Sequence, residues 1–227
     1  MLRIIGDVHG KYEQYVAIAK NSEYSVQIGD FGFHREWVKL NYSGLSTDKH
    51  KVIAGNHDDY DIAPSYGNYL GNYGEYTLNG VKFFFVRGGL SIDRCNRLLT
   101  QFSTGEKTYW SQEELNLVEM MDCLRVYQEV KPDIVLTHVP AASFSNIMTG
   151  GDDSILTRFK FHKGFKENHQ LLGDELLKIH RPKMWFSAHF HKSFSAEIDG
   201  TEFISLDELE YFDLISYGPT VEDRIQL

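Results

Sequence analysis

The chain has 227 residues, 42% of them hydrophobic and 14% aromatic, and a formal net charge of −9 at pH 7. This composition excludes a disordered or fibrous protein, and the length suits one domain spanning residues 1–227. The negative net charge argues against polynucleotide binding, because binding to nucleic-acid backbones requires a basic surface. The apolar runs are far too short to cross a membrane, and the N-terminus lacks the continuous apolar stretch of a signal peptide. We therefore expect a soluble, cytoplasmic protein without membrane partners.

Short apolar runs predict strands that are separated by helical or loop segments. In chain order the strands cover Leu2–Ile5, Ser25–Ile28, Lys51–Ala54, Asp133–Thr137 and Met184–Ser187. The dipeptides Asn79-Gly80 and Asp199-Gly200 suit type I′ turns, and each predicts a hairpin. Strands that alternate with helices, together with hairpins, indicate an α/β domain with a mixed sheet or two packed sheets.

Helices are predicted at Lys11–Lys20, at about Ser111–Val130 and at Gln170–Ile179. The longest of them opens with a capping box, in which Ser111 is the N-cap and Glu114 follows three residues later. Its apolar face is predicted to consist of Leu117, Met121, Leu124 and Tyr127. The segment 145–170 is loop-like, with two adjacent glycines and mixed charges, and is a candidate lid over a site.

Each predicted strand is followed closely by a carboxylate, a carboxamide or an imidazole. These side chains are Asp7, His9, Asp30, Asn56, His138, His189 and His191. Ligands bind at the carboxyl ends of the strands in open α/β sheets, so we expect the seven side chains to meet there. Oxygen and imidazole donors without thiolates fit Mn, Fe or Zn and tolerate Mg or Ni. Seven donors exceed one tetrahedral zinc site and suffice for two ions if a carboxylate bridges them.

The ordered motifs D-x-H, G-D, G-N-H-D, H and A-H-x-H resemble those of the calcineurin-like metallophosphoesterases, in particular their bacterial and phage serine/threonine phosphatase-like branch. The motifs span residues 7–191, and all five occur in the order of the family. Ala188 stands where the family has glycine in the last motif, and a small residue is therefore kept. The resemblance implies a four-layer α/β/β/α sandwich of two mixed sheets flanked by helices. It also implies two divalent metal ions, with Mn²⁺ favoured over Fe, Zn, Ni or Mg.

The family pattern implies a role for each matching residue. Asp7, His9 and His191 would bind the first ion, and Asn56, His138 and His189 the second. Asp30 would bridge both ions. His57 would stabilise the transition state or protonate the leaving oxygen, and Asp58 would orient it.

The resemblance implies a phosphoesterase, and we expect hydrolysis of a phosphate monoester by attack of a metal-bridging hydroxide. The substrate could be a small molecule, a nucleotide or a phosphoprotein. Protein phosphatases resemble G-D-x-x-D-R-G after the bridging aspartate, and this chain lacks that arginine, which argues against the last class. Further substrate contacts are expected from His34, Arg87, Arg94 or Arg97.

Two alternatives remain open from the sequence. A phosphodiesterase or nucleotide pyrophosphate hydrolase is favoured if the tyrosine-rich connection 60–76 lines the pocket, because tyrosines can stack on nucleobases. A catalytically silent, metal-binding interaction domain would be expected to have lost a metal ligand or His57, and the sequence retains them all.

Overall fold

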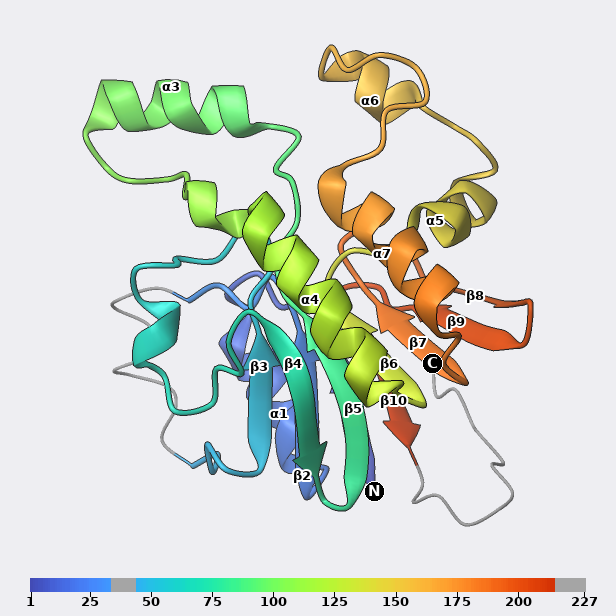
Figure 1. Ribbon diagram of the computed structural model, residues 1–227. Helices are drawn as coiled ribbons and strands as arrows, with labels where there is room; N and C mark the ends of the chain where they lie inside the picture. Colours follow the sequence, from blue (N-terminus) through green and yellow to red (C-terminus); the bar gives the residue numbers. More distant parts are fainter. Residues whose placement is uncertain (34–43, 215–227) are drawn as a thin grey trace.

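The structure, a computed structural model, describes residues 1–33 and 44–214 (Figure 1). The described strands form two mixed sheets, with the orders β10-β1-β2-β3 and β4-β5-β6-β7-β9-β8. The strands of the first sheet are β1 (Leu2–Ile5), β2 (Tyr24–Ile28), β3 (His50–Ile53) and β10 (Tyr211–Leu214). The strands of the second sheet are β4 (Tyr73–Leu78), β5 (Val81–Val86), β6 (Ile134–Thr137), β7 (Met184–Ser187), β8 (Phe194–Ile198) and β9 (Thr201–Ser205). In the first sheet β1, β2 and β3 are parallel, and in the second β5, β6, β7 and β9 are parallel.

Helices cover the outer face of each sheet, so the molecule has the four layers α/β/β/α. On the first sheet lies α1 (Tyr12–Lys20), and on the second lie α4 (Leu117–Val130), α5 (Ala142–Thr149) and α7 (Asn168–Ile179). Figure 1 shows α4 and α7 running side by side across the second sheet. Two other helices, α3 (Arg94–Thr104) and α6 (Ser154–Arg158), lie at one end of the molecule, beyond the strands (Figure 1). In the described part of the chain, no helix is long and apolar enough to cross a membrane.

The two sheets are held together by an apolar layer to which both contribute. Successive residues of a strand point to opposite faces, so Phe186 of β7 enters this layer while Trp185 faces the helices. Phe186 contacts Phe212 of β10 across the layer, with 5.1 Å between the ring centroids. Each buried ring of this kind contributes roughly 1.5–3 kcal/mol. This packing fixes the carboxyl ends of the two sets of parallel strands relative to each other.

The five predicted strands and both hairpins are confirmed, with shifts of at most one residue at the strand ends. The helices predicted at Lys11–Lys20 and Gln170–Ile179 are also present, as α1 and α7. The strand β10 and the helices α3, α5 and α6 were not predicted. The segment 145–170 is correspondingly more ordered than a loop, because it contains most of α5, all of α6 and the start of α7.

The longest predicted helix begins later than expected. The N-cap of α4 is Asn116 rather than Ser111, and its side chain accepts hydrogen bonds from the amides of Val118 and Glu119. The Glu119 carboxylate accepts from the Asn116 amide in return, which completes a capping box. Asparagine is as strong an N-cap as serine, so the sequence offers two possible starts for this helix, at Ser111 and at Asn116.

Residues Ser111–Glu113 form a 3₁₀ turn instead of the first helical turn. Glu113 points inward, where its carboxylate accepts from the amide and hydroxyl of Ser91. The predicted apolar face of the helix is correct at Tyr127, which is buried, and wrong at Met121, which is exposed. Leu117, the first residue of α4, is also exposed.

Truncating the ring of Phe186 tests the role of the layer between the sheets. We expect Phe186→Ala to lower the free energy of unfolding by about 3–5 kcal/mol, because it removes buried apolar area and leaves a cavity. The measurement is equilibrium unfolding in urea. Phe102→Ala is the matched control, since the Phe102 side chain on α3 is 92% exposed, and its effect should stay within about 0.5 kcal/mol. Equal losses in the two variants would contradict this assignment of the core.

Candidate metal centre

All seven predicted metal ligands come together where the two sheets meet. They follow β1, β2 and β3 of the first sheet and β6 and β7 of the second, at the carboxyl ends of these parallel strands. Backbone hydrogen bonds link the loops that carry them: the amide of His9 donates to Asp30 O at 2.7 Å, and that of Ala188 donates to His138 O at 2.9 Å. The site is therefore built from loops that brace one another.

The ligand atoms form two groups that share Asp30. In the first group, Asp7, His9, Asp30 and His191 each offer an atom within 4.8 Å of the others. His191 Nε2 lies 3.1 Å from Asp7 Oδ2 and 2.9 Å from His9 Nε2. His9 Nε2 also lies 3.7 Å from Asp30 Oδ2. Carboxylate oxygens and imidazole nitrogens gathered this closely are typical of a site for a cation.

The second group contains Asp30, His138 and His189. His138 Nε2 lies 3.4 Å from Asp30 Oδ1 and 3.2 Å from His189 Nδ1. Asn56 completes this group, because its Oδ1 lies 3.0 Å from His138 Nε2 and 2.9 Å from His189 Nδ1. The donors are oxygens and imidazole nitrogens, which is the set that Mn, Fe and Zn accept.

Four of the seven residues adopt the left-handed backbone conformation. The φ angles are 47° for His9, 50° for Asp30, 69° for His189 and 47° for His191. Residues other than glycine rarely adopt this conformation, and each costs about 1–3 kcal/mol unless its surroundings impose it. The chain therefore turns sharply at the strand ends, and the turn after β7 explains how His189 and His191 reach different groups.

Two glycines leave room for these side chains. A Cβ at Gly29 would overlap the His138 ring, and one at Gly55 would overlap the Asp30 carboxylate and lie 2.7 Å from His138 Nε2. Gly29 also has a φ of 112°, which side chains rarely tolerate. Only glycine fits before Asp30 and before Asn56, because neighbouring side chains occupy the space that a Cβ would need.

The charges at the centre depend on one another. Burial would raise the pKa of Asp30, but His138, His57 and His9 beside it hold that pKa well below its usual range. Burial would lower the pKa of His138, and Asp30 and Asp7 raise it instead. Burial lowers the pKa of His189. The Asp30 carboxylate is therefore ionised and His189 is neutral, which are the forms that bind metal ions, whereas a metal ion would have to displace the proton of His138.

Buried hydrogen bonds orient several of the ligands from behind. His138 Nδ1 lies 3.1 Å from Ile28 O, so its Nε2 is left facing the centre. The Asn56 amide donates to Ser91 Oγ at 3.1 Å, which turns Asn56 Oδ1 toward the two imidazoles. Such supporting contacts fix ligand orientation and raise metal affinity.

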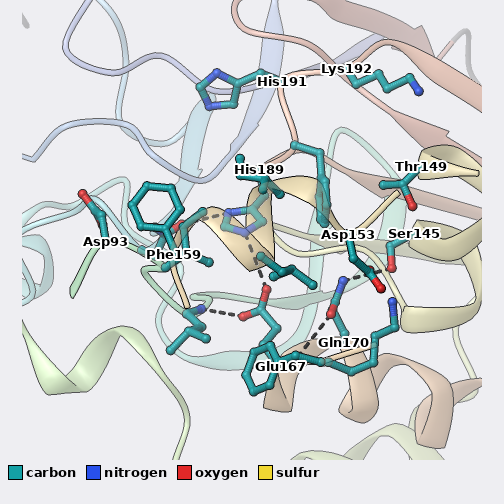
Figure 2. Close-up of a pocket in the computed structure, with 18 of the residues that line it drawn as sticks. Asp93, Ser145, Thr149, Asp153, Phe159, Glu167, Gln170, His189, His191 and Lys192 are labelled. Carbon is teal, nitrogen blue, oxygen red and sulfur yellow. Dashed lines mark hydrogen bonds and ion pairs between the residues drawn. The ribbon is translucent and has the colours of Figure 1, made fainter. Parts of the chain in front are cut away.

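Glu167 supports His189 and was not singled out from the sequence. One carboxylate oxygen lies 3.5 Å from His189 Nε2, and the other accepts the amide of Leu90 at 2.5 Å (Figure 2). Glu167 is buried, and burial raises its pKa to about 8. The sequence feature that could have pointed to Glu167 is its position as the N-cap of α7, where its side chain forms a capping box with Gln170.

The two predicted catalytic residues lie at the centre, but they are not paired with each other. His57 is exposed at the centre, and its ring centroid lies 5.6 Å from that of His9. Asp58 is buried, and its carboxylate accepts the amides of Gly55 at 2.7 Å and Gly32 at 2.6 Å, with further amides from residues 31 and 33. Among the described residues, Asp58 makes no hydrogen bond to the His57 ring. Asp58 instead ties the loop after β3 to the loop after β2.

The predicted substrate-binding arginines are held by other parts of the protein, and within the described residues only Arg97 contacts a residue of the centre, through the backbone of Asn56. Arg87 is buried, donates to Asn72 Oδ1 and to Gln112 O, and stacks on Tyr60. Arg97 donates to Thr108 O, Asn56 O and the Ser91–Glu113 pair. Arg94 lies 3.8 Å from Glu114 near the surface. Loop carbonyls and side-chain oxygens thus hold all three guanidinium groups. His34 lies outside the described residues.

A cavity of about 570 Å³ opens beside the two groups of ligands. Asp30, Asn56, His57, His189 and His191 form its inner end, and α5, α6 and the start of α7 form its far wall (Figure 2). Among the described residues that line the cavity there is no tyrosine, so the tyrosine-rich connection 60–76 does not face it.

Substituting the two glycines 55 and 67 tests the geometry of the centre. We expect Gly55→Ala to weaken Mn²⁺ binding by about 10–100-fold, the range seen when the support of a ligand is lost. Gly67→Ala is the control, because the nearest atom to its added Cβ is Thr47 Oγ1 at 3.5 Å, and it should bind as the wild type does. Titration calorimetry measures the affinity, and circular dichroism checks the fold. Unchanged binding in folded Gly55→Ala would contradict the geometry described here.

The chain matches the model of the calcineurin-like phosphoesterase family over residues 2–193. A lariat debranching enzyme from Entamoeba histolytica is 26% identical over 222 residues, which cover 91% of this chain and 59% of that protein. The chain thus spans about three fifths of the length of this curated relative.

Two solved structures share the fold at low sequence identity. A phosphopantetheinyl hydrolase from Mycobacterium tuberculosis is 12% identical with a TM-score of 0.51, over 91% of this chain and 89% of that one. A dimetal phosphatase from Danio rerio is 11% identical with a TM-score of 0.51, over 94% and 92%. The fold, the clustered ligands and the family match lead to one conclusion: the chain belongs to the calcineurin-like phosphoesterases, which are metal-dependent hydrolases of phosphoric esters.

Proposed function

We propose that this protein is a two-metal phosphomonoesterase. The observation that carries the proposal is the division of the candidate ligands into two groups with Asp30 common to both, beside a cavity of about 570 Å³ that can take an organic group. Asp7, His9 and His191 would hold the first ion, Asn56, His138 and His189 would hold the second, and Asp30 would be shared by both. Mn²⁺ suits this mixture of oxygen and imidazole donors best, and Fe or Zn is also compatible.

When bound, the two divalent ions supply Lewis-acid stabilisation of the phosphoryl oxygens and activate water. The protein supplies orientation and proton transfer. Water attacks phosphorus in line with the ester bond, and that bond breaks toward the cavity. His57, which lines the cavity, donates a proton to the departing ester oxygen, and the proton released by the attacking water replaces it. Asp58 is a positioning residue, because the amides that it accepts come from both loops next to Asp30.

A phosphodiesterase is the second candidate. The His191 side chain is 43% exposed, so the centre is open to solvent beside it, and a second ester group could extend there. The curated relative is named for a debranching reaction, which is a reason to assay substrates with two organic groups. Against this candidate, the tyrosine-rich connection does not line the cavity. A catalytically silent domain is the least favoured reading, since all seven ligands and His57 are retained.

Hydrolysis of paired chromogenic mono- and diesters with added Mn²⁺ tests the proposal. We expect the wild type to cleave the monoester faster. We expect Asp30→Asn to lower the rate by about 10²–10³-fold, which corresponds to a loss of about 3–4 kcal/mol of transition-state stabilisation.

Asp133→Asn provides the control for this experiment. Its carboxylate is exposed and pairs with Lys183 at 3.2 Å, so the same chemical change should leave the rate unaltered. Equal rates for Asp30→Asn and the wild type would rule out the bridged centre. A faster diester would replace the first candidate with the second.

A further inference from the structure

The cavity is lined by apolar and aromatic side chains as well as polar ones, beside a centre of charged groups. Five side chains that line it are hydrophobic and only half-buried: Ile92, Leu156, Phe159, Phe165 and Phe190. Half-buried apolar groups that face one cavity are typical of a binding site for an organic ligand. Their position beside the metal ligands places that ligand next to the reacting phosphorus.

The aromatic rings of this wall extend outward from the centre. Phe190 lies against the ring of His189, with the centroids 5.4 Å apart and the planes at 81°. Phe165 is held by Phe161, whose ring centroid lies 4.6 Å away. Phe159 follows α6 and is among the side chains around the cavity in Figure 2. A planar group that entered here would meet aromatic faces and edges on more than one side.

The charges around the cavity disfavour a second anionic group on the ligand. Asp93, Asp152 and Asp153 line its outer part. Two lysines line it as well, but Lys192 Nζ donates to Met148 O at 2.7 Å and Lys166 Nζ donates to Asn146 Oδ1. Both ammonium groups are held at α5, and the three carboxylates outnumber them, so an additional phosphate or carboxylate on the ligand would be disfavoured.

We propose that the cavity binds an uncharged aromatic group of the substrate, so that the enzyme takes aryl phosphates or nucleoside monophosphates in preference to polyphosphates and polar sugar phosphates. This inference rests on the proposed function, because it assigns the cavity to the group esterified to the reacting phosphate. Phe159 and Phe165 are the specificity-determining residues, since each contributes a ring to the wall and neither is a metal ligand.

Binding of phosphonates tests the inference without requiring hydrolysis, because their P–C bond is not cleaved. We expect calorimetry on the Mn²⁺-loaded protein to give about tenfold tighter binding of phenylphosphonate than of methylphosphonate, from burial and ring contacts. The preference should fall severalfold in Phe159→Ala and Phe165→Ala. Phe102→Ala, on the exposed face of α3, should keep it.

A further probe, 4-carboxyphenylphosphonate, tests the charge argument on the wild type alone and needs no variant to fold. It should bind more weakly than phenylphosphonate. Equal affinities for phenyl- and methylphosphonate, tighter binding of the carboxylated probe, or an unchanged preference in both folded phenylalanine variants would overturn the inference.

The two proposals fail in different ways. Hydrolysis of esters without any aryl preference would overturn the specificity and leave the phosphoesterase intact. A clear aryl preference in binding, with no ester cleaved, would sustain the aromatic site and overturn the proposed function.

Discussion

The buried carboxylate of Asp30 is the constraint on which the rest of the centre depends. Its side chain is 1% exposed, so its charge must be balanced by neighbours rather than by water. His138 Nε2 lies 3.4 Å from Asp30 Oδ1, to which the amide of His57 donates at 2.8 Å, and His9 Nε2 lies 3.7 Å from Asp30 Oδ2. Cationic or metal-binding partners must therefore surround Asp30 on both sides, and this requirement accounts for the two groups of ligands that share it.

The two sheets supply the rigidity that this arrangement requires. Positive φ angles at His9, Asp30, His189 and His191 disfavour the folded chain by about 1–3 kcal/mol each. Regular strands precede all four residues, and the packed layer between the sheets fixes those strands. The packed core thus supplies the stability, and the strained turns at the strand ends place the ligand side chains. This division is common where a protein positions functional groups in advance.

Much of the site could be predicted from the sequence, because a ligand that directly follows a strand has its place fixed by the strand. Asp7, Asp30 and His138 are of this kind. The supporting residues could not be predicted, because Glu167 and Ser91 reach their partners through tertiary packing across 22 and 35 residues of chain. The start of α4 was misplaced for a local reason, since two adjacent cap sequences compete and only the buried contacts of Glu113 decide between them.

Electron paramagnetic resonance of the Mn²⁺-titrated protein would show whether Asp30 joins two metal ions into one centre, as we propose. Ions that share a carboxylate lie roughly 3.5–4 Å apart, so their spins couple. The account predicts that the spectrum of isolated Mn²⁺ gives way to that of a coupled pair as a second equivalent is added. A spectrum of isolated Mn²⁺ that persists at saturation would contradict it.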